Sequence, residues 1–147
     1  MFNNLAVGCE QELTSRSRMR ELIENFPNQI AEAANDLKNL DTKRHDEEAK
    51  GIKPSGVLIL GMGGSGIGGL FVSSILRKTS KIPIITNSDY SIPGWVGKDT
   101  LVIACSNSGN TEETIASANE SIKRGSKICF IASGGKLEDL ALKVDAP

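Results

Sequence analysis

After Pro54, the sequence alternates short apolar runs with segments that carry a helical pattern, and this alternation restricts the fold more than any other feature. The apolar runs are residues 57–60, 82–85, 101–104 and 128–132. Short apolar runs of this kind are typical of strands that are buried on both faces. Strands that alternate with helices form parallel β-α-β units with right-handed connections. We therefore predict an α/β fold, with a doubly wound, mostly parallel sheet and helices on both of its faces.

Three segments that follow these runs are predicted as helices. Residues 67–75 repeat apolar side chains at helical spacing, and residues 136–142 form a shorter helical segment. Residues 111–124 carry glutamates at the start and basic residues at the end, with Gly125 just beyond, and these are the usual signals of helix ends. Val144 indicates the start of a fifth strand, so we expect the domain to be incomplete at its C-terminal end.

The first 54 residues have a different pattern. Apolar residues recur at helical spacing on both sides of Pro27, and proline is favoured in the first turn of a helix. Residues 41–55 are charged and end in Lys-Pro-Ser, which is typical of a linker. We expect a helical N-terminal arm and linker in residues 1–54 and the sheet domain in residues 55–147.

The charge pattern excludes several classes of function. The chain has 17 basic and 18 acidic side chains and a net charge of −1, and the two signs are mixed along the sequence. The basic stripe that marks nucleic-acid binding is therefore missing. No apolar run approaches the roughly 20 residues that cross a bilayer, and residues 1–11 lack the layout of a signal peptide. We expect a cytoplasmic protein that binds neither nucleic acid nor membrane.

The cysteines and the histidine argue against a metal site. Cys9, Cys105 and Cys129 are far apart and form no C-x-x-C pair, which is the usual signal of zinc or redox chemistry. Cys105 and Cys129 lie within apolar runs and are interpreted as small core residues. His45 is the only histidine, and it lies in a run of mixed charge that we expect to be solvated. We predict no metal ligand and no cofactor.

Residues 61–69 contain six glycines between the first predicted strand and a helix. The free N–H groups and partial positive charge of a helix N-terminus favour an anion at this point. Gly61, Gly63 and Gly66 satisfy G-x-G-x-x-G, and Asp89 follows the second strand, so a dinucleotide is one candidate ligand. Close packing between helix and strand is the structural alternative. A P-loop is excluded because no lysine lies nearby, and a G-x-S-x-G nucleophile elbow because its last glycine is absent.

Residues 106–111 follow the third predicted strand and are rich in short hydroxyl side chains. Ser106, Ser108 and Thr111 can each donate a hydrogen bond to a phosphate oxygen, and the following helix adds backbone N–H donors. A capping box accounts for one of these hydroxyls, but not for three around a glycine. Both segments follow strands of one parallel sheet, where ligands bind at the carboxyl ends. A dinucleotide domain does not need the second segment, so the pair favours a sugar phosphate.

The two segments together resemble the sugar isomerase (SIS) domain, and more narrowly the first SIS domain of the bifunctional phosphoglucose/phosphomannose isomerase family. The motifs Gly-Met-Gly-Gly-Ser-Gly at residues 61–66 and Ser-Asn-Ser-Gly-Asn-Thr-Glu-Glu-Thr at residues 106–114 carry the resemblance, with Ser-Gly-Gly-Lys-Leu at residues 133–137. It covers residues 57–140 and implies a flavodoxin-like, three-layer sandwich. It also implies that a sugar phosphate is bound by these residues: Gly64, Ser65, Ser106, Ser108 and Thr111.

That family interconverts glucose 6-phosphate or mannose 6-phosphate with fructose 6-phosphate by proton transfer through an enediol. The resemblance implies a homodimer and a second SIS domain downstream, which carries the glutamate, histidine and lysine of the reaction. We therefore expect this chain to be the amino-terminal, sugar-phosphate-binding half of the enzyme, with no catalytic residue of its own. A non-catalytic SIS module that senses sugar phosphates is the first alternative, and an NAD(P)-binding domain is the second.

Overall fold

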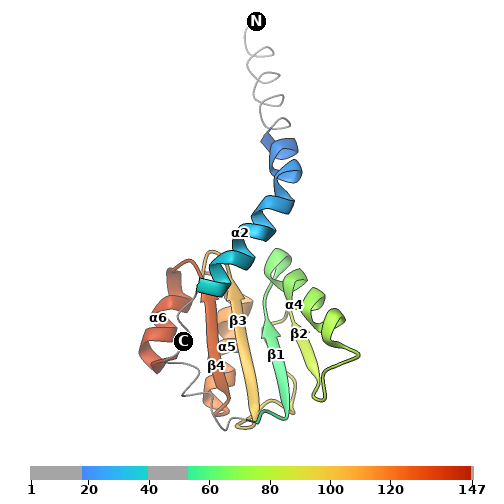
Figure 1. Cartoon of the computed structure of the whole chain (residues 1–147). Coiled ribbons are helices and arrows are strands. Elements are labelled where there is room, and N and C mark those ends of the chain that lie inside the picture. The colour runs from blue at the N-terminus through green and yellow to red at the C-terminus, as the bar shows by residue number, and fades with distance from the viewer. Residues whose placement is uncertain (1–17, 40–52, 147) are drawn as a thin grey trace, which may run out of the picture. The chain divides into compact units, whose positions relative to one another are not determined.

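The computed structural model describes residues 18–39 and 53–146 of this chain, which divides into two units at residues 1–48 and 49–147. In the first unit, residues 18–24 are helical, and a second helix, α2, covers Phe26–Asn39 (Figure 1). The break at Asn25 confirms that a helix restarts beside Pro27. Five of the apolar side chains that the structure describes in this unit are more than half exposed: Met19, Leu22, Ile23, Phe26 and Ile30.

The second unit contains a four-stranded, all-parallel sheet with the strand order β2-β1-β3-β4. The arrowheads in Figure 1 show that all four strands point the same way. The strands are β1 Gly56–Leu60, β2 Ile84–Asn87, β3 Thr100–Ser106 and β4 Lys127–Ala132. The predicted α/β fold with a parallel sheet is therefore confirmed.

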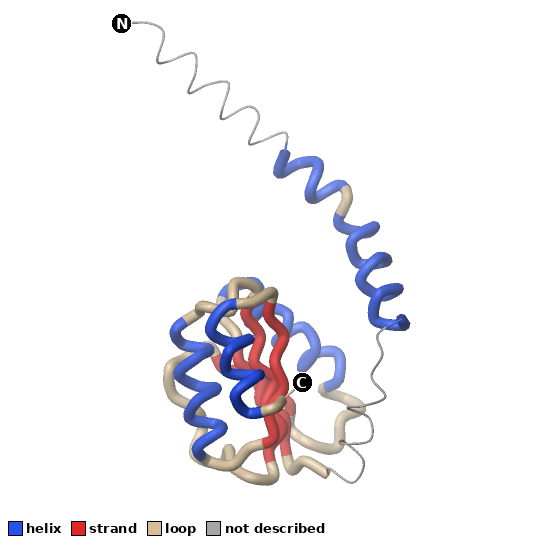
Figure 2. The backbone as a smooth tube through the Cα atoms, turned by 90° about the vertical axis from the view of Figure 1, so that its left-hand side faces the viewer, coloured by secondary structure: helices blue, strands red, loops and turns tan. Residues whose placement is uncertain are grey.

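Three helices connect or follow these strands: α4 Gly63–Leu76, α5 Glu112–Lys123 and α6 Gly135–Val144. Helix α4 packs mainly against β2 and β1, whereas α5 packs mainly against β3 and β4 and α6 packs against β4. Figure 2 shows α5 and α6 on one face of the sheet and α4 on the other. This arrangement gives the predicted three layers, with helices on both faces.

The buried core lies between the sheet and the helices α5 and α6. Strand β3 alternates buried and half-buried residues, and it contributes Val102 and Ala104 to this core. Leu58 and Leu60 of β1 are fully buried in the same cluster. On the opposite face, beyond α4, Ile131 is 63% exposed. The sheet is therefore densely packed on one face, while the described residues leave part of the other face open.

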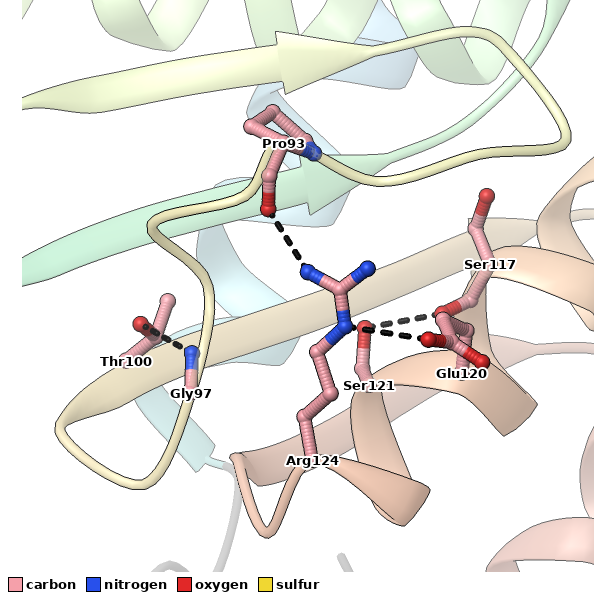
Figure 3. Close-up of polar contacts among 7 residues, drawn as sticks. All are labelled: Pro93, Gly97, Thr100, Ser117, Glu120, Ser121 and Arg124. Atoms are coloured by element: carbon pink, nitrogen blue, oxygen red, sulfur yellow. Dashed lines mark hydrogen bonds and ion pairs between the residues drawn. The ribbon is translucent and has the colours of Figure 1, made fainter.

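The irregular segment between β2 and β3 is held against the end of α5 (Figure 3). The Arg124 guanidinium donates a hydrogen bond of 3.0 Å to the Pro93 carbonyl and lies 3.0 Å from the Glu120 carboxylate. At the end of the segment, the Thr100 hydroxyl accepts a hydrogen bond of 3.1 Å from Gly97 N–H. These contacts fix the connection that brings the chain back to the start of β3.

The predictions at Val144 and at Ile82 are wrong. The expected fifth strand at Val144 does not form, because α6 continues through that residue and Asp145 ends it in a left-handed conformation with φ of 51°. The second strand begins at Ile84 rather than Ile82. Pro83 has no N–H for a strand ladder, and instead its carbonyl accepts a hydrogen bond of 2.9 Å from Val57 N–H.

Candidate functional site

The glycine-rich segment 61–69 is shorter as a loop than its sequence indicates. Helix α4 begins at Gly63, so only Gly61 and Met62 form the turn, and the remaining glycines occupy the first two turns of the helix. The structure thereby corrects the expected helix start near Ile67. The glycines beyond Gly63 therefore have roles within a helix rather than within a flexible loop.

Two of these glycines are required by close packing. A Cβ at Gly66 would lie 2.6 Å from the Gly61 carbonyl oxygen, and a Cβ at Gly69 would lie 2.8 Å from the side chains of Ile59 and Thr86. Helix α4 can approach β1 and β2 closely only because these side chains are missing. The packing interpretation of the glycines is thus correct for Gly66 and Gly69. Gly64, in contrast, faces open space, and a Cβ there would meet no atom within 4 Å.

The N-terminus of α4 leaves backbone donors available. Its N-cap residue, Met62, makes no side-chain cap hydrogen bond, and the Met62 carbonyl accepts a hydrogen bond of 3.3 Å from Gly66 N–H. The N–H groups in the first turn of a helix have no acceptor within that helix. Together with the helix dipole, they favour an anion beside Gly64 and Ser65.

The hydroxyl groups of the second segment meet each other. Ser106 is the last residue of β3 and is 3% exposed, and its Oγ lies 2.8 Å from the Thr111 Oγ1 in a hydrogen bond. Thr111 is the N-cap residue of α5, yet its side chain makes no cap hydrogen bond. The capping interpretation therefore does not explain this hydroxyl. Ser108 is exposed, and its Oγ accepts a hydrogen bond of 3.3 Å from Asn110 N–H.

An open hollow of about 540 Å³ lies between the two segments. Its lining residues are Met62, Gly64, Ser65, Ser106, Asn107, Ser108 and Thr111. All five residues predicted to contact a sugar phosphate are in this set, so the fold brings them to one place. Sequence reasoning missed Met62 and Asn107, because it considered only hydroxyl groups and glycines. The amide of Asn107, placed between two serines of the motif, was the available signal.

Two acidic residues directly follow Thr111, which lines this hollow. The Tyr90 hydroxyl lies 3.5 Å from a carboxylate oxygen of Glu112, at the start of α5. The negative charge of Glu113 raises the pKa of Tyr90, and partial desolvation and Glu112 raise it further. Glu112 is exposed and Glu113 is half-buried. Tyr90 therefore stays protonated over a wide pH range and acts as a neutral hydrogen-bonding group.

The cysteines in the described residues are partly buried rather than fully buried core residues. Cys105 and Cys129 are both free thiols. Burial raises the pKa of both, and the neighbouring Cys105 raises that of Cys129 further. Within residues 18–39 and 53–146, no group of three or more His, Cys, Asp or Glu side chains could hold a metal ion. Cys9 and His45 lie outside the described residues.

Within the described part of the chain, no helix is both long enough and apolar enough to span a membrane. A family model described as the SIS domain matches residues 52–142 of the sequence. This chain belongs to the SIS domain family. The matched range contains all seven residues that line the hollow.

Two curated relatives support a narrower comparison with this SIS domain. The chain is 41% identical over 125 residues to the bifunctional phosphoglucose/phosphomannose isomerase of Caldicellulosiruptor bescii, covering 85% of this chain and 35% of that protein. It is 42% identical over 112 residues to the protein of the same name from Thermoplasma acidophilum, covering 76% of this chain and 35% of that protein. The chain thus spans about a third of the length of these relatives.

Two solved structures show a similar fold. The NanR protein of Vibrio vulnificus, solved with ManNAc-6P, has a TM-score of 0.56 at 21% identity, over 93% of this chain and 52% of that one. A hypothetical protein has a TM-score of 0.60 at 17% identity, over 80% of this chain and 64% of that one. At these identities, the similarity supports the fold alone.

Proposed function

We propose that this chain is the sugar-phosphate-binding part of an isomerase that interconverts glucose 6-phosphate or mannose 6-phosphate with fructose 6-phosphate. One observation carries the proposal: Gly64, Ser65, Ser106, Ser108 and Thr111 line a single hollow between the starts of α4 and α5. The names of the similar proteins, bifunctional phosphoglucose/phosphomannose isomerases, supply the substrate class. The hollow supplies the chemistry for the phosphate group.

The hollow suits a phosphate monoester, which carries about −1.5 to −2 charges near neutral pH. Two helix N-termini direct backbone N–H groups and a partial positive charge toward it. In the Ser106–Thr111 pair, one hydroxyl donates to the other, which leaves one hydroxyl hydrogen to donate to the ligand. Ser65 and Ser108 add two more hydroxyl groups from the lining. The phosphate is held by neutral donors.

The isomerase reaction also needs groups that this hollow does not offer. Proton transfer between C1 and C2 requires a base and an acid placed within hydrogen-bond reach of the substrate. The lining side chains are those of methionine, glycine, serine, asparagine and threonine, and none is an effective base near neutral pH. Our proposal assigns binding to this chain and proton transfer to a second SIS domain downstream. It also includes a homodimer, a cytoplasmic location, and a division into an arm at 1–54 and the domain at 55–147.

Calorimetric titration of the 147-residue chain tests the binding proposal. Fructose 6-phosphate, glucose 6-phosphate and mannose 6-phosphate should bind, whereas fructose without phosphate should not. Inorganic phosphate should bind more weakly than the sugar phosphates. No binding of any of these ligands to folded protein would contradict the proposal.

Two outcomes would favour the alternative functions. If the complete gene product binds sugar phosphates but does not isomerise them, the SIS domain acts as a sensor module. If NADH fluorescence rises on mixing and fructose 6-phosphate does not reverse it, the glycine motif binds a dinucleotide. Isomerase assays on the complete gene product and NADH titrations of this chain separate the three functions.

A further inference from the structure

The turn that follows β4 is hydrogen-bonded to the hydroxyl-rich segment 106–111 at several points. Ser133 donates twice to Asn107, from its N–H to the carbonyl oxygen at 3.1 Å and from its Oγ to Oδ1 at 3.0 Å. Leu137 N–H donates to the Gly109 carbonyl at 3.0 Å. Strands β3 and β4 are neighbours, with Ser106 opposite Ala132, so both segments leave the sheet at the same level. The two turns therefore form one hydrogen-bonded unit.

The side chain of Asn110 links the two turns from the other direction. Its Nδ2 donates to the Ser108 carbonyl at 2.9 Å, and its Oδ1 accepts a hydrogen bond of 3.3 Å from Lys136 N–H. Both ends of the amide are thus engaged within the protein. Asn110 is not among the residues that line the hollow, although its neighbours Asn107, Ser108 and Thr111 are. Asn110 therefore contacts the backbone of the lining residue Ser108 without lining the hollow itself.

The two turns approach each other so closely that side chains are excluded between them. Gly109 has φ of 65°, and a Cβ there would overlap the Gly134 carbonyl oxygen. Gly135 has φ of 74°, and a Cβ there would lie 2.6 Å from the Ser108 carbonyl oxygen and 2.7 Å from Asn110 Nδ2. Backbone-to-backbone contact of this kind leaves segment 106–111 little freedom to change shape.

We propose that Asn110 and Ser133 are positioning residues that hold segment 106–111 in the shape that binds phosphate. The inference rests on the proposed function of the hollow. A loop that is ordered before the ligand arrives avoids the entropy loss of ordering on binding. Since neither side chain lines the hollow, their effect passes through Asn107 and Ser108, which do. The serine-glycine-glycine turn after β4 is then part of the binding machinery, although it donates nothing to the ligand.

The test compares Asn110→Ala with Asn119→Ala in the full chain. Asn119 is a matched control, because its exposed amide also donates a 2.9 Å hydrogen bond to a backbone carbonyl, that of Ile115 in α5. Both variants lose one such bond, but only the first loses the link to the phosphate segment. We expect Asn110→Ala to weaken binding of inorganic phosphate and of fructose 6-phosphate by the same factor, about three- to tenfold. Asn119→Ala should leave both affinities unchanged.

A second pair of variants checks the Ser133 side chain. Ser133→Ala removes the hydroxyl that donates to Asn107, and we expect about a two- to fivefold loss of affinity. Ser133→Thr keeps the hydroxyl at an exposed position and should restore the affinity. If Asn110→Ala and Ser133→Ala lower the stability of the fold but leave both affinities unchanged, the turn is purely structural and the inference is wrong.

Amide hydrogen exchange separates failure of this inference from failure of the proposed function. The Gly109 N–H, which donates a 3.1 Å hydrogen bond to the Ser106 carbonyl, should exchange faster in Asn110→Ala than in Asn119→Ala. Unchanged exchange overturns the positioning role whether or not any ligand binds. Faster exchange in a chain that binds no phosphate sinks the proposed function and supports the link between the two turns.

Discussion

The hydroxyl oxygens of Ser106 and Thr111 lie 2.8 Å apart, although one residue ends β3 and the other precedes α5. The pair closes a turn at the carboxyl edge of the sheet and places two hydroxyls at the wall of the hollow. The Thr111 hydroxyl does not cap α5, and one of the pair's two hydroxyl hydrogens remains to donate to a ligand. Their importance can be measured directly.

We expect Ser106→Ala and Thr111→Ala each to weaken binding of fructose 6-phosphate about tenfold or more, because a hydrogen bond to a charged ligand is lost. The two effects should not add, since each hydroxyl orients the other. Thr111→Ser should retain most of the affinity. Ser73→Ala is the control, because the Ser73 hydroxyl is exposed on α4 and donates to the Leu70 carbonyl instead. Additive losses in calorimetric titrations of the double variant would show that the pair does not act as a unit.

Alanine substitutions at two glycines of α4 should have opposite effects on the stability of the fold. Gly64→Ala meets no atom within 4 Å and should stabilise the helix by about 0.5–1 kcal/mol, yet its methyl group enters the hollow and should weaken phosphate binding. Gly69→Ala meets Ile59 and Thr86 at 2.8 Å and should destabilise the fold by about 1–3 kcal/mol. Urea unfolding gives the free energy of unfolding of each variant, and phosphate titration gives its affinity for phosphate. Equal loss of stability in both would contradict the close packing of α4 on the sheet.

Tyr90 is the only tyrosine, so its titration can be followed by ultraviolet absorbance without ambiguity. Nearby negative charge disfavours the tyrosinate, and the pKa of Tyr90 is therefore raised above its ordinary value of 10.0. Glu113→Gln should lower the Tyr90 pKa toward that value, and Glu112→Gln should lower it less. Glu138→Gln, on α6, serves as the control that should leave the curve in place. If neither substitution changes the Tyr90 titration curve, Glu112 and Glu113 do not lie near Tyr90 in solution.

The thiols of Cys105 and Cys129 should react slowly with an alkylating reagent near neutral pH. Only the thiolate reacts, and burial raises the pKa of both thiols above the ordinary 9.0. In the folded chain, the alkylation rates should keep rising above pH 9.0, whereas in the urea-unfolded chain they should level off near pH 9.0. The folded chain keeps these thiol protons to a higher pH than the unfolded chain does. The free energy of unfolding should therefore fall as pH rises through 9.0. Mass spectrometry of the labelled peptides reports each cysteine separately.

The core at the α5 and α6 face predicts a large difference between two leucines. Leu58 is 0% exposed and Leu142 is 76% exposed. Leu58→Ala should reduce the free energy of unfolding by about 2–5 kcal/mol, while Leu142→Ala should change it by less than about 0.5 kcal/mol. Urea denaturation curves for the two variants test this difference. Comparable losses would mean that Leu142 is covered in solution.

Much of this fold could be predicted because buried parallel strands have a recognisable sequence pattern, which is a short apolar run between two helical segments. The boundaries were less accessible, and Val144 shows why: a single apolar residue fits a strand or the last turn of a helix equally well. The glycines of α4 were harder still. The reason for Gly69 lies in the side chains of Ile59 and Thr86, which are close only after the strands have paired.

The site could be predicted by residue type but not by geometry. Short hydroxyls beside glycines indicated a phosphate ligand, and all five candidate residues do line the hollow. The contact between Ser106 and Thr111 depends on the turn that joins them, and no residue pattern specifies it. The support from Ser133 depends on a strand pairing that joins residues 26 positions apart in sequence.

The hollow is lined without a single cationic side chain among the described residues, and this determines how it will respond to ionic strength. Salt weakens attraction between exposed charges, over a screening length of about 8–10 Å at ordinary ionic strength. Hydrogen bonds from fixed amides and hydroxyls depend on contact distance and orientation, which dissolved ions hardly alter. A sugar phosphate held mainly in this way should lose less affinity in concentrated salt than one held by lysine or arginine side chains.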